Sequence, residues 1–375
     1  MHPQSAVIKG TSPQTIGLKV AGLFVIERNI KLLSGAGVKK ISLLLSEDEK
    51  TFFYTKIARH LENIDAEIAI LEGKIPSDGS IVIPSTILLQ QYQLQNFNLY
   101  FKKNKKNYEP IFNDEMFIIN SKHDCQKAEK ILSDYIIKNT GGFIAQKINK
   151  RISIPISRKL ANTRIHPNYL TIFNMLIGLA SSLFILLSVK EGNSQLSAYL
   201  FMLMGGFLFQ AASVLDGVDG EVAKFTLKVS KIGGWLDTIS DNTTLLLFLI
   251  STSYVFYRFM GGLASIITIA VLFTGLALML ANIISYLSKY SQSGSLVAYD
   301  KEFLQKLPQN DKLVSFSLKM KYITKKELFS LFFFLFAFTG KIYYIIPLAA
   351  IILVAAGIIL SIINMKYLKK FGEMQ

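Results

Sequence analysis

The chain has 375 residues, of which 51% are hydrophobic and 18% are charged, and its mean hydropathy is +0.37. This composition is too apolar for an ordinary soluble enzyme and too charged for a protein that lies wholly in a membrane, so we expect a soluble part and a membrane part. The net charge of +15 is concentrated beside the apolar segments, which favours contact with anionic lipids and argues against nucleic-acid binding.

Residues 1–140 alternate short β-like runs with helical patterns. The β-like runs cover residues 41–45, 66–71, 80–84 and 116–120, and the helical patterns cover residues 24–34, 48–63 and 124–138. Such alternation is typical of an α/β domain with a largely parallel sheet. Cys125 is the single cysteine, which excludes an intramolecular disulfide, and the first residues lack the pattern of a signal peptide.

The segment GLKVAGLFVIERNIKLLSGAGVKKISLLLS, residues 17–46, resembles the opening of a sugar nucleotidyltransferase. A working enzyme of that kind needs a glycine-rich basic loop after its first strand and an acidic metal ligand at the end of a later strand. Here the first loop, GTSPQTIGLK, is short and lacks arginine, and the later strand, IVIPSTIL, offers no carboxylate. We therefore expect a nucleotidyltransferase-like cytoplasmic domain that is inactive and structural or regulatory; the alternative is an active cytidylyltransferase. Lys19 is either a remnant phosphate ligand or a surface lysine.

Residues 141–166 form a basic juxtamembrane junction, in which basic residues are interleaved with an apolar series spaced by four. The basic residues are Lys147, Lys150, Arg151, Arg158, Lys159 and Arg164, and the apolar series is Ile144, Ile148, Ile152, Ile156 and Leu160. This pattern suits a helix that lies on the membrane surface, and it also suits a linker helix packed on the soluble domain.

Residues 167–375 carry six apolar runs, and Asn168 is the expected N-cap of the first. The runs cover residues 169–189, 196–215, 235–256, 263–287, 328–338 and 342–365. Most are long enough to cross a bilayer, whereas the fifth, with 11 residues, is re-entrant unless its helix starts earlier. Lysine-rich segments alternate with sparsely charged turns, so the positive-inside rule favours both termini in the cytoplasm. We therefore expect an all-α domain of six transmembrane helices, in a multi-pass protein of the cell membrane.

The carboxylates between Gln195 and Ser288 are gathered in one short segment. They are Asp216, Asp219, Glu221, Asp237 and Asp241. The first two aspartates are three residues apart and the last two are four apart, so on helices each pair projects from one face. Clustered carboxylates beside a membrane repel one another unless they share a cation, and oxygen ligands favour Mg²⁺, Mn²⁺ or Ca²⁺ over zinc. The alternative is that they cap helix ends. The topology above places this segment at the cytoplasmic face.

The same segment resembles the signature of the CDP-alcohol phosphotransferase family. Its fixed positions are Asp216, Asp219, Gly220, Ala223, Lys224, Gly233, Asp237 and Asp241. The family usually carries arginine at the position of Lys224, and lysine keeps the charge but loses the planar fork that contacts phosphate twice. The resemblance implies transfer of a substituted phosphate from a CDP-linked donor to an alcohol acceptor, with release of CMP, in phospholipid or polyol-phosphodiester synthesis.

The resemblance also implies roles for these residues. The ligands of two Mg²⁺ or Mn²⁺ ions are implied to be Asp216, Asp219, Asp237 and Asp241. Asp241 doubles as the catalytic base that takes the acceptor's proton. The substrate-binding residues are implied to be Gly220, Ala223, Lys224 and Gly233. Helix packing alone also selects small residues, so the glycines and the alanine have two interpretations. Membrane lipids are expected partners, and a homodimer is one possible assembly.

Residues 124–160 resemble the connection into the membrane part of the fused inositol-phosphate cytidylyltransferase and di-inositol-phosphate-phosphate synthase proteins, which implies an inositol phosphate acceptor. Lysines on the expected cytoplasmic side would form a pocket for its phosphate, or they are ordinary lysines of the positive-inside kind. They are Lys228, Lys231, Lys325 and Lys326. Asn242 stands where relatives of the inositol branch often have arginine, which argues against that acceptor. Two other classes are alternatives: a transporter, which usually shows inverted repeats, and a catalytically impaired lipid-binding membrane protein.

Overall fold

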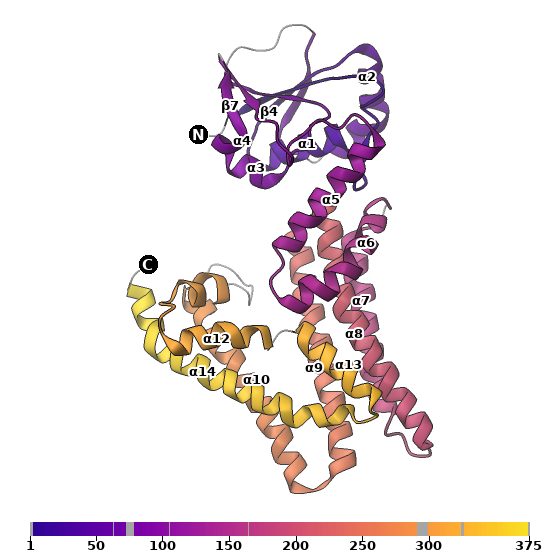
Figure 1. The fold of residues 1–375 in the computed structure, drawn as a ribbon, viewed down its shortest axis with the longest axis vertical. Coiled ribbons are helices and arrows are strands. Elements are labelled where there is room, and N and C mark those ends of the chain that lie inside the picture. The colour runs from indigo at the N-terminus through magenta and orange to yellow at the C-terminus, as the bar shows by residue number, and fades with distance from the viewer. Residues whose placement is uncertain are drawn as a thin grey trace. The chain divides into compact units, whose positions relative to one another are not determined.

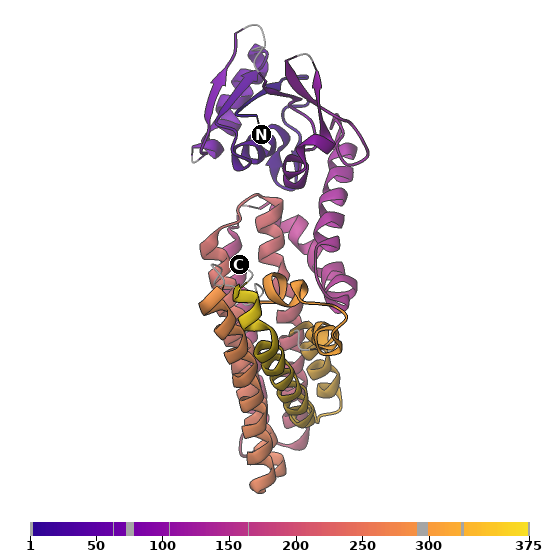
Figure 2. The ribbon, with the colours of Figure 1, turned by 90° about the vertical axis from the view of Figure 1, so that its left-hand side faces the viewer.

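The computed structural model describes residues 3–62, 64–72, 79–104, 106–163, 165–290, 299–323 and 326–373 (Figures 1 and 2). The chain forms two compact units. The first comprises Met1–Asn139, Ile154–Ile165 and Glu221–Val229, and the second comprises Thr140–Ser153, His166–Gly220 and Ser230–Gln375. Each unit is therefore assembled from segments that are far apart in the sequence.

The first unit contains a six-stranded sheet in the order β5-β4-β1-β6-β8-β7. Its strands are β1 (Ser5–Lys9), β4 (Lys40–Leu44), β5 (Glu67–Ile70), β6 (Ile81–Pro84), β7 (Phe101–Asn104) and β8 (Asn107–Pro110). All neighbouring strands are parallel except β7 and β8, which form an antiparallel hairpin. The prediction of a largely parallel sheet is confirmed. A separate antiparallel pair consists of β2 (Lys19–Val20) and β3 (Leu23–Phe24).

The β-like run at residues 116–120 does not form a strand, and it contributes only an isolated bridge between Ile118 and Ile87. The side chain of Asn113 explains this difference. Its Oδ1 accepts hydrogen bonds from the backbone amides of Glu115 and Met116, at 2.9 and 2.8 Å. Because this local turn uses backbone donors at the start of the run, they are not available to a sheet.

The first unit also contains helices. They are α1 (Val25–Gly35), α2 (Glu47–Phe52), α3 (Gln91–Gln95), α4 (Phe97–Tyr100) and α5 (Lys122–Lys138). The main core joins α1 to the strands, through fully buried side chains such as Ile8, Ile30 and Ile83. The helix expected at residues 48–63 is broken after α2 into a π-helical turn, η1 (Phe53–Ile57), and a 3₁₀ turn, η2 (Ala58–Leu61). The hydroxyl of Thr55 donates to the carbonyls of residues 51 and 52, a type of bond that often bends helices.

The junction contributes to the first unit through part of α6 (Lys150–Ala161), which follows a π-helical turn, η3 (Ala145–Asn149). Ile154 and Ala161 are buried in a core cluster with residues of α5. The Arg158 guanidinium donates a hydrogen bond of 2.6 Å to the carboxylate of Glu129 on α5. From residue 154 onward the junction therefore packs on the α/β unit, which agrees with the second of its two interpretations. Arg164 lies outside the described residues.

Residues 221–229 also belong to the first unit, although α8 (Gln195–Phe225) begins in the second. The ring of Phe225 is buried in the same core cluster as Val20 and Ile136. The buried guanidinium of Arg28 donates a hydrogen bond of 2.9 Å to the Phe225 carbonyl oxygen, and burial lowers the pKa of Arg28 to about 10. Ser157 donates a hydrogen bond of 2.6 Å to the buried carboxylate of Glu221. The α/β unit thus fixes the last turn of α8.

The second unit is helical. Its helices include α7 (Pro167–Leu187), most of α8, α9 (Lys231–Met260), α10 (Gly262–Tyr290), α12 (Lys312–Ile323), α13 (Lys326–Phe338) and α14 (Ile345–Glu373), with short turns η4 (Tyr299–Phe303), η5 (Leu304–Lys306) and η6 (Ile342–Tyr344). The expected N-cap of α7, Asn168, is wrong. Pro167 takes the first helical position, and the Nδ1 of His166 accepts a hydrogen bond of 3.2 Å from the Asn168 amide, so His166 is the N-cap.

Among the described residues, five helices are long and apolar enough to cross a membrane. They are Pro167–Leu187, Gln195–Phe225, Lys231–Met260, Gly262–Tyr290 and Ile342–Lys369. The fifth apolar run, residues 328–338, is not among them, because its helix, α13, has 13 residues. A helix of that length reaches roughly 20 Å, and the hydrocarbon core of a bilayer is about 30 Å thick.

Small residues allow these helices to approach closely. A Cβ atom added to Gly275 of α10 would lie 2.6 Å from the backbone nitrogen of Val354, and α14 runs along α10 in both views (Figures 1 and 2). Similarly, a Cβ atom added to Gly178 of α7 would lie 2.6 Å from the Cγ2 of Thr244 on α9. Such positions are typical of membrane helix interfaces, where van der Waals packing replaces the hydrophobic effect.

Candidate functional site

Three aspartates of the predicted site converge in the second unit. Asp216 lies on α8, and Asp237 and Asp241 lie one turn apart on α9. One carboxylate oxygen from each lies within 4.8 Å of the other two, and all three side chains are half-buried. The helical spacing of the two α9 aspartates places them on one face, as expected. The structure therefore brings together oxygen ligands from two helices.

Asp219, the fourth predicted metal ligand, is buried and makes different contacts. Its carboxylate accepts a hydrogen bond from the Thr171 hydroxyl of α7 and another from the Gly220 amide. It is not part of the group of three, although its negative charge interacts with those of Asp216 and Asp237. Asp219 thus adjoins the group, and both of its oxygens accept hydrogen bonds from the protein.

Lys326, at the start of α13, supplies a cation to the site. Its Nζ lies 3.0 Å from the Oδ1 of Asp216 and 2.8 Å from the Oδ1 of Asp241. The lysine side chain is only 13% exposed. Besides any role as a positive-inside lysine, Lys326 therefore has specific partners, the two carboxylates from α8 and α9. Lys325 lies outside the described residues, and Lys228 and Lys231 are exposed.

Two polar residues of α7 reach the site, and the sequence analysis missed both. Besides the bond from Thr171 to Asp219, the Asn174 amide donates a hydrogen bond of 3.4 Å to Asp216. Both α7 residues are buried. They are three residues apart in an otherwise apolar run, a spacing that puts them on one helix face. That pattern was the signal that a polar site lay beside this helix.

The glycines of the motif differ in their surroundings. A Cβ atom added to Gly220 would meet no atom of the described residues within 4 Å, whereas one added to Gly233 would lie 3.0 Å from Ser230 Oγ and 3.1 Å from Asn168 Oδ1. Ser230 is the N-cap of α9 and accepts a hydrogen bond of 2.9 Å from the Gly233 amide. Packing at the start of α9 therefore explains the small size of Gly233, and open space surrounds Gly220.

Ala223 and Lys224 lie in the last turn of α8, in the part of that helix that belongs to the first unit. Ala223 is half-buried and Lys224 is exposed. Both follow the motif aspartates on one continuous helix. A lysine in the last turn also interacts favourably with the negative end of the helix dipole, which gives Lys224 a structural role besides any contact with a substrate.

The donor set fits a hard divalent cation. All three groups that converge are carboxylates, which Mg²⁺ and Mn²⁺ accept as ligands and which zinc sites use less often than cysteine and histidine. Asn174 and Thr171 donate hydrogen bonds to the carboxylates and so orient them, which is the usual arrangement behind metal ligands.

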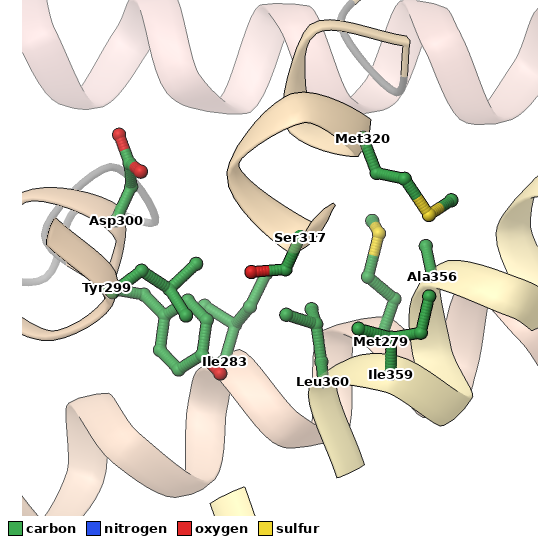
Figure 3. Close-up of a pocket in the computed structure, with 10 residues that line it drawn as sticks. Met279, Ile283, Tyr299, Asp300, Ser317, Met320, Ala356, Ile359 and Leu360 are labelled. Atoms are coloured by element: carbon green, nitrogen blue, oxygen red, sulfur yellow. The ribbon is translucent and has the colours of Figure 1, made fainter. Parts of the chain in front are cut away.

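A second feature of this unit is an apolar cavity of about 160 Å³ between α10, α12 and α14 (Figure 3). Its wall includes Met279, Ile283, Met320, Ile359 and Leu360, and the side chains of Met279 and Met320 point into the same space. The lining differs from the carboxylate site, because it is dominated by aliphatic and thioether groups. It suits a hydrocarbon group and not a charged donor.

Comparison with known proteins identifies relatives of the chain. Residues 164–363 match the family model described as CDP-alcohol phosphatidyltransferase. The chain is 36% identical over 132 residues to a protein of Archaeoglobus fulgidus and 34% identical over 147 residues to a protein of Aquifex aeolicus. Both are named bifunctional IPC transferase and DIPP synthase. These matches cover 35% and 39% of this chain but only 24% and 28% of the two relatives.

A third relative is the archaetidylinositol phosphate synthase of Pyrococcus horikoshii. It is 35% identical to the chain over 120 residues, which are 31% of this chain and 54% of that protein. In these comparisons the chain therefore spans about a quarter to about half of the length of the relatives it matches.

Proposed function

Because the chain belongs to the CDP-alcohol phosphatidyltransferase family, we propose that it transfers a substituted phosphate from a CDP-linked donor to an alcohol acceptor and releases CMP. The observation that carries the proposal is the convergence of Asp216, Asp237 and Asp241 from two helices. Family members that work in this way require carboxylates to hold the cations that bind the donor. This chain has them on helices that are long and apolar enough to cross a membrane.

The four motif aspartates hold the metal in this proposal, as two Mg²⁺ or Mn²⁺ ions. When bound, the ions neutralise the pyrophosphate of the donor and stabilise the departing phosphate. Asp216, Asp237 and Asp241 provide the shared oxygens, and Asp219, which adjoins the three, is the fourth ligand of the proposal. Asp241 accepts the proton of the acceptor hydroxyl, the role that the resemblance implies for it, and a carboxylate can act as a base when its neighbours disfavour its charge.

Other residues of the motif bind the donor. The open space at Gly220 allows a nucleotide to approach the backbone of α8, and the tight packing at Gly233 keeps the start of α9 close to α7. Lys224 contacts a phosphate as a point charge. Ala223, half-buried in the same turn, leaves room beside it. In this way Gly220 and Ala223, three residues apart on α8, leave space for the donor beside Lys224.

An inositol phosphate is the proposed acceptor, supported by the relative named archaetidylinositol phosphate synthase. We place the site at the cytoplasmic face of the cell membrane, since the basic segments beside α8, α9 and α13 favour that side. Six helices of the domain lie in the membrane. Five of them cross the bilayer, and α13, which is too short to cross it, enters it only in part. A homodimer is the proposed assembly.

We assign the α/β unit a nucleotidyltransferase-like fold without activity. The carboxylate of Glu49 occupies the space beside the loop after β1, where a working nucleotidyltransferase would bind phosphate. A Cβ atom added to Gly10, directly after β1, would collide with the side chain of Glu49. That carboxylate is buried and accepts hydrogen bonds of 2.9 Å from the amide and the hydroxyl of Ser46, so it is held in place. A fixed negative charge beside this loop disfavours a triphosphate.

The deciding experiment measures CMP release from CDP-linked lipids and CDP-linked polyols, with and without Mg²⁺. We expect release to require the cation and to be lost in Asp237→Asn and Asp219→Asn, because each removes a carboxylate that the metal pair needs. Glu191→Gln is the matched control, since Glu191 is exposed in the connection between α7 and α8. Full release of CMP by either aspartate variant, or in excess chelator, would contradict the metal-dependent reaction. The remaining alternatives would then be a lipid-binding membrane protein and a transporter.

A further inference from the structure

We propose that Lys326 is a built-in competitor of the divalent cation: its ammonium group holds Asp216 and Asp241 together until the metal displaces it. The inference rests on the proposed function in one respect, because it takes these carboxylates as metal ligands. It adds a device that governs how tightly, and at what metal concentration, the site is filled.

The geometry places one ammonium between two helices. Lys326 Nζ contacts one oxygen of Asp216 on α8 and one oxygen of Asp241 on α9, at 3.0 and 2.8 Å. The two carboxylate side chains are 26% and 30% exposed, and the lysine side chain is 13% exposed. The start of α13 is thus joined to both metal-ligand helices through one charged group, in a place with limited access to water.

The ammonium and a metal ion exclude each other. Mg²⁺ binds carboxylate oxygens at about 2.0 to 2.1 Å, so an ion shared by Asp216 and Asp241 would lie beside Nζ in its present position. The oxygens of the three aspartates lie within 4.8 Å of one another, so an ammonium that contacts two of these residues lies close to any ion that the group binds. Two positive charges at such a short distance repel strongly where water is scarce. The lysine must therefore move when the metal binds.

This arrangement has a consequence in each state. Without metal, the ammonium offsets part of the repulsion among the three carboxylates and so keeps α8 and α9 in the geometry that the metal needs. With metal, the displaced ammonium stays near the site, because α13 holds its backbone. Removing the ammonium should then have two effects of opposite sign: lower stability without metal and tighter binding of metal.

The combination of lower stability without metal and tighter metal binding distinguishes competition from other roles of a lysine. A lysine that only supports the structure would lower both the stability and the metal affinity when it is removed. A lysine that only contacts the phosphate of a substrate would leave the metal affinity unchanged in the absence of substrate. Only competition predicts that removing the lysine raises the affinity of the site for metal.

The test is a titration of the full-length protein with Mn²⁺ in one detergent, without donor or acceptor, followed by calorimetry. We expect Lys326→Met to bind Mn²⁺ about ten- to a hundredfold more tightly than the parent, because a charge-assisted contact no longer has to be broken. Lys326→Arg keeps a cation in place and should bind no more tightly than the parent. The matched control is Lys319→Met, which removes an exposed lysine of α12 and should stay within about twofold of the parent.

Thermal unfolding of the same variants tests the other expected effect, the lower stability without metal. In chelator, Lys326→Met should unfold at a lower temperature than the parent, and saturating Mn²⁺ should remove the difference. A third measurement needs no variant at all. Saturating Mn²⁺ should increase the reaction of Lys326 in the parent with an amine-acylating reagent, read by mass spectrometry of the peptide that contains it.

Equal or weaker Mn²⁺ binding by Lys326→Met overturns the inference, and so does tighter binding by Lys326→Arg or an unchanged reactivity of Lys326 with Mn²⁺. CMP release is recorded in parallel, so the two proposals can fail separately. If the parent releases CMP but Lys326→Met binds Mn²⁺ no more tightly, only the competition is wrong. If no donor yields CMP but the affinity rises as expected, the competition stands and the proposed reaction is wrong.

Discussion

The hydroxyl group of Thr171 on α7 donates a hydrogen bond to the carboxylate of Asp219 on α8. Both residues are buried, so the bond is shielded from competing water. It joins the first membrane helix of the domain to the aspartate motif on the second. In metal sites, side chains that donate a hydrogen bond to a ligand orient it, and their loss typically weakens metal binding. Thr171 is therefore expected to hold the Asp219 carboxylate in its orientation beside the other carboxylates.

We predict that Thr171→Val weakens Mn²⁺ binding by about ten- to a hundredfold, the usual effect of losing such a partner. Valine has nearly the shape of threonine but no hydroxyl, so packing is conserved while the buried carboxylate loses a donor. Unfolding in chelator should also become easier, by about 1 to 3 kcal/mol. Thr171→Ser keeps the hydroxyl and is the matched control. If the valine variant binds Mn²⁺ as the parent does, Asp219 is not a metal ligand.

The sequence was sufficient to predict how the aspartates are spaced on their helices. The repeat of 3.6 residues places Asp237 and Asp241 on one face of α9, and the structure has them there. The partner from α13 was not predictable in the same way. Lys326 lies 85 residues from Asp241, and its contact depends on how three helices pack, which no local pattern specifies.

The end of α8 shows a second limit of sequence patterns. The apolar run ends at residue 215, but the helix continues to Phe225. The segment DGVDGEVAKF has no proline to stop the helix, and its last turn is buried in the α/β unit, where Arg28 binds the Phe225 carbonyl. Hydropathy reports where a helix leaves an apolar environment, whereas the helix itself ends where its backbone groups find other partners.

The α/β unit shows a similar limit of sequence patterns. Alternating β-like and helical patterns were sufficient to predict a parallel sheet, because buried parallel strands are short apolar runs. The β7–β8 hairpin was not predicted, since its segment, FKKNKKNYEP, is polar and has exposed side chains along β7. An edge strand with lysines on it does not show the apolar pattern of the strands inside the sheet.

Substitution at Gly220 distinguishes a substrate surface from helix packing. We predict that Gly220→Ala stabilises the protein or leaves it unchanged, because the added methyl group meets open space and alanine favours the helix by roughly 0.5 to 1 kcal/mol. Donor affinity should nevertheless fall, since that space is the proposed approach of the nucleotide. Donor dissociation constants and unfolding temperatures of the same preparations measure the two effects.

The control is Gly234→Ala on α9. A Cβ atom added there also meets no described atom within 4 Å, so the two substitutions are alike in helix propensity and in space. Only the change at Gly220 is expected to weaken donor binding. Equal donor affinities of parent and Gly220→Ala would remove this glycine from the proposed substrate surface.

The α/β unit should have no cytidylyltransferase activity. We predict that the full-length protein, incubated with CTP and polyol phosphates in Mg²⁺, releases pyrophosphate only at the background rate. The whole chain is the right sample, because residues 154–165 and 221–229 complete this unit. Asp237→Asn serves as a second sample in which the proposed membrane site is disabled. Pyrophosphate release above background in both samples would show that the carboxylate of Glu49 leaves room for a triphosphate after all.

Lys224 provides the sharpest test of donor recognition, because it is the position at which this chain departs from its family. We predict that Lys224→Arg preserves or improves donor affinity, whereas Lys224→Ala weakens it. Arginine carries the same charge on a planar fork that matches two phosphate oxygens. Alanine removes a charge-assisted contact, which should cost roughly 1.5 to 3 kcal/mol, or about ten- to a hundredfold in affinity.

The alternative role of Lys224 is to stabilise the last turn of α8, and the two roles give different results. A structural lysine would change the unfolding temperature and leave the donor dissociation constant alone. Lys228→Ala is the matched control, since Lys228 is an exposed lysine just beyond the end of the same helix. Donor affinity is measured for all variants in one detergent with Mg²⁺ and no acceptor, so that no turnover occurs. An alanine variant at residue 224 that binds donor within about twofold of the parent, as Lys228→Ala should, would refute a phosphate contact by this lysine.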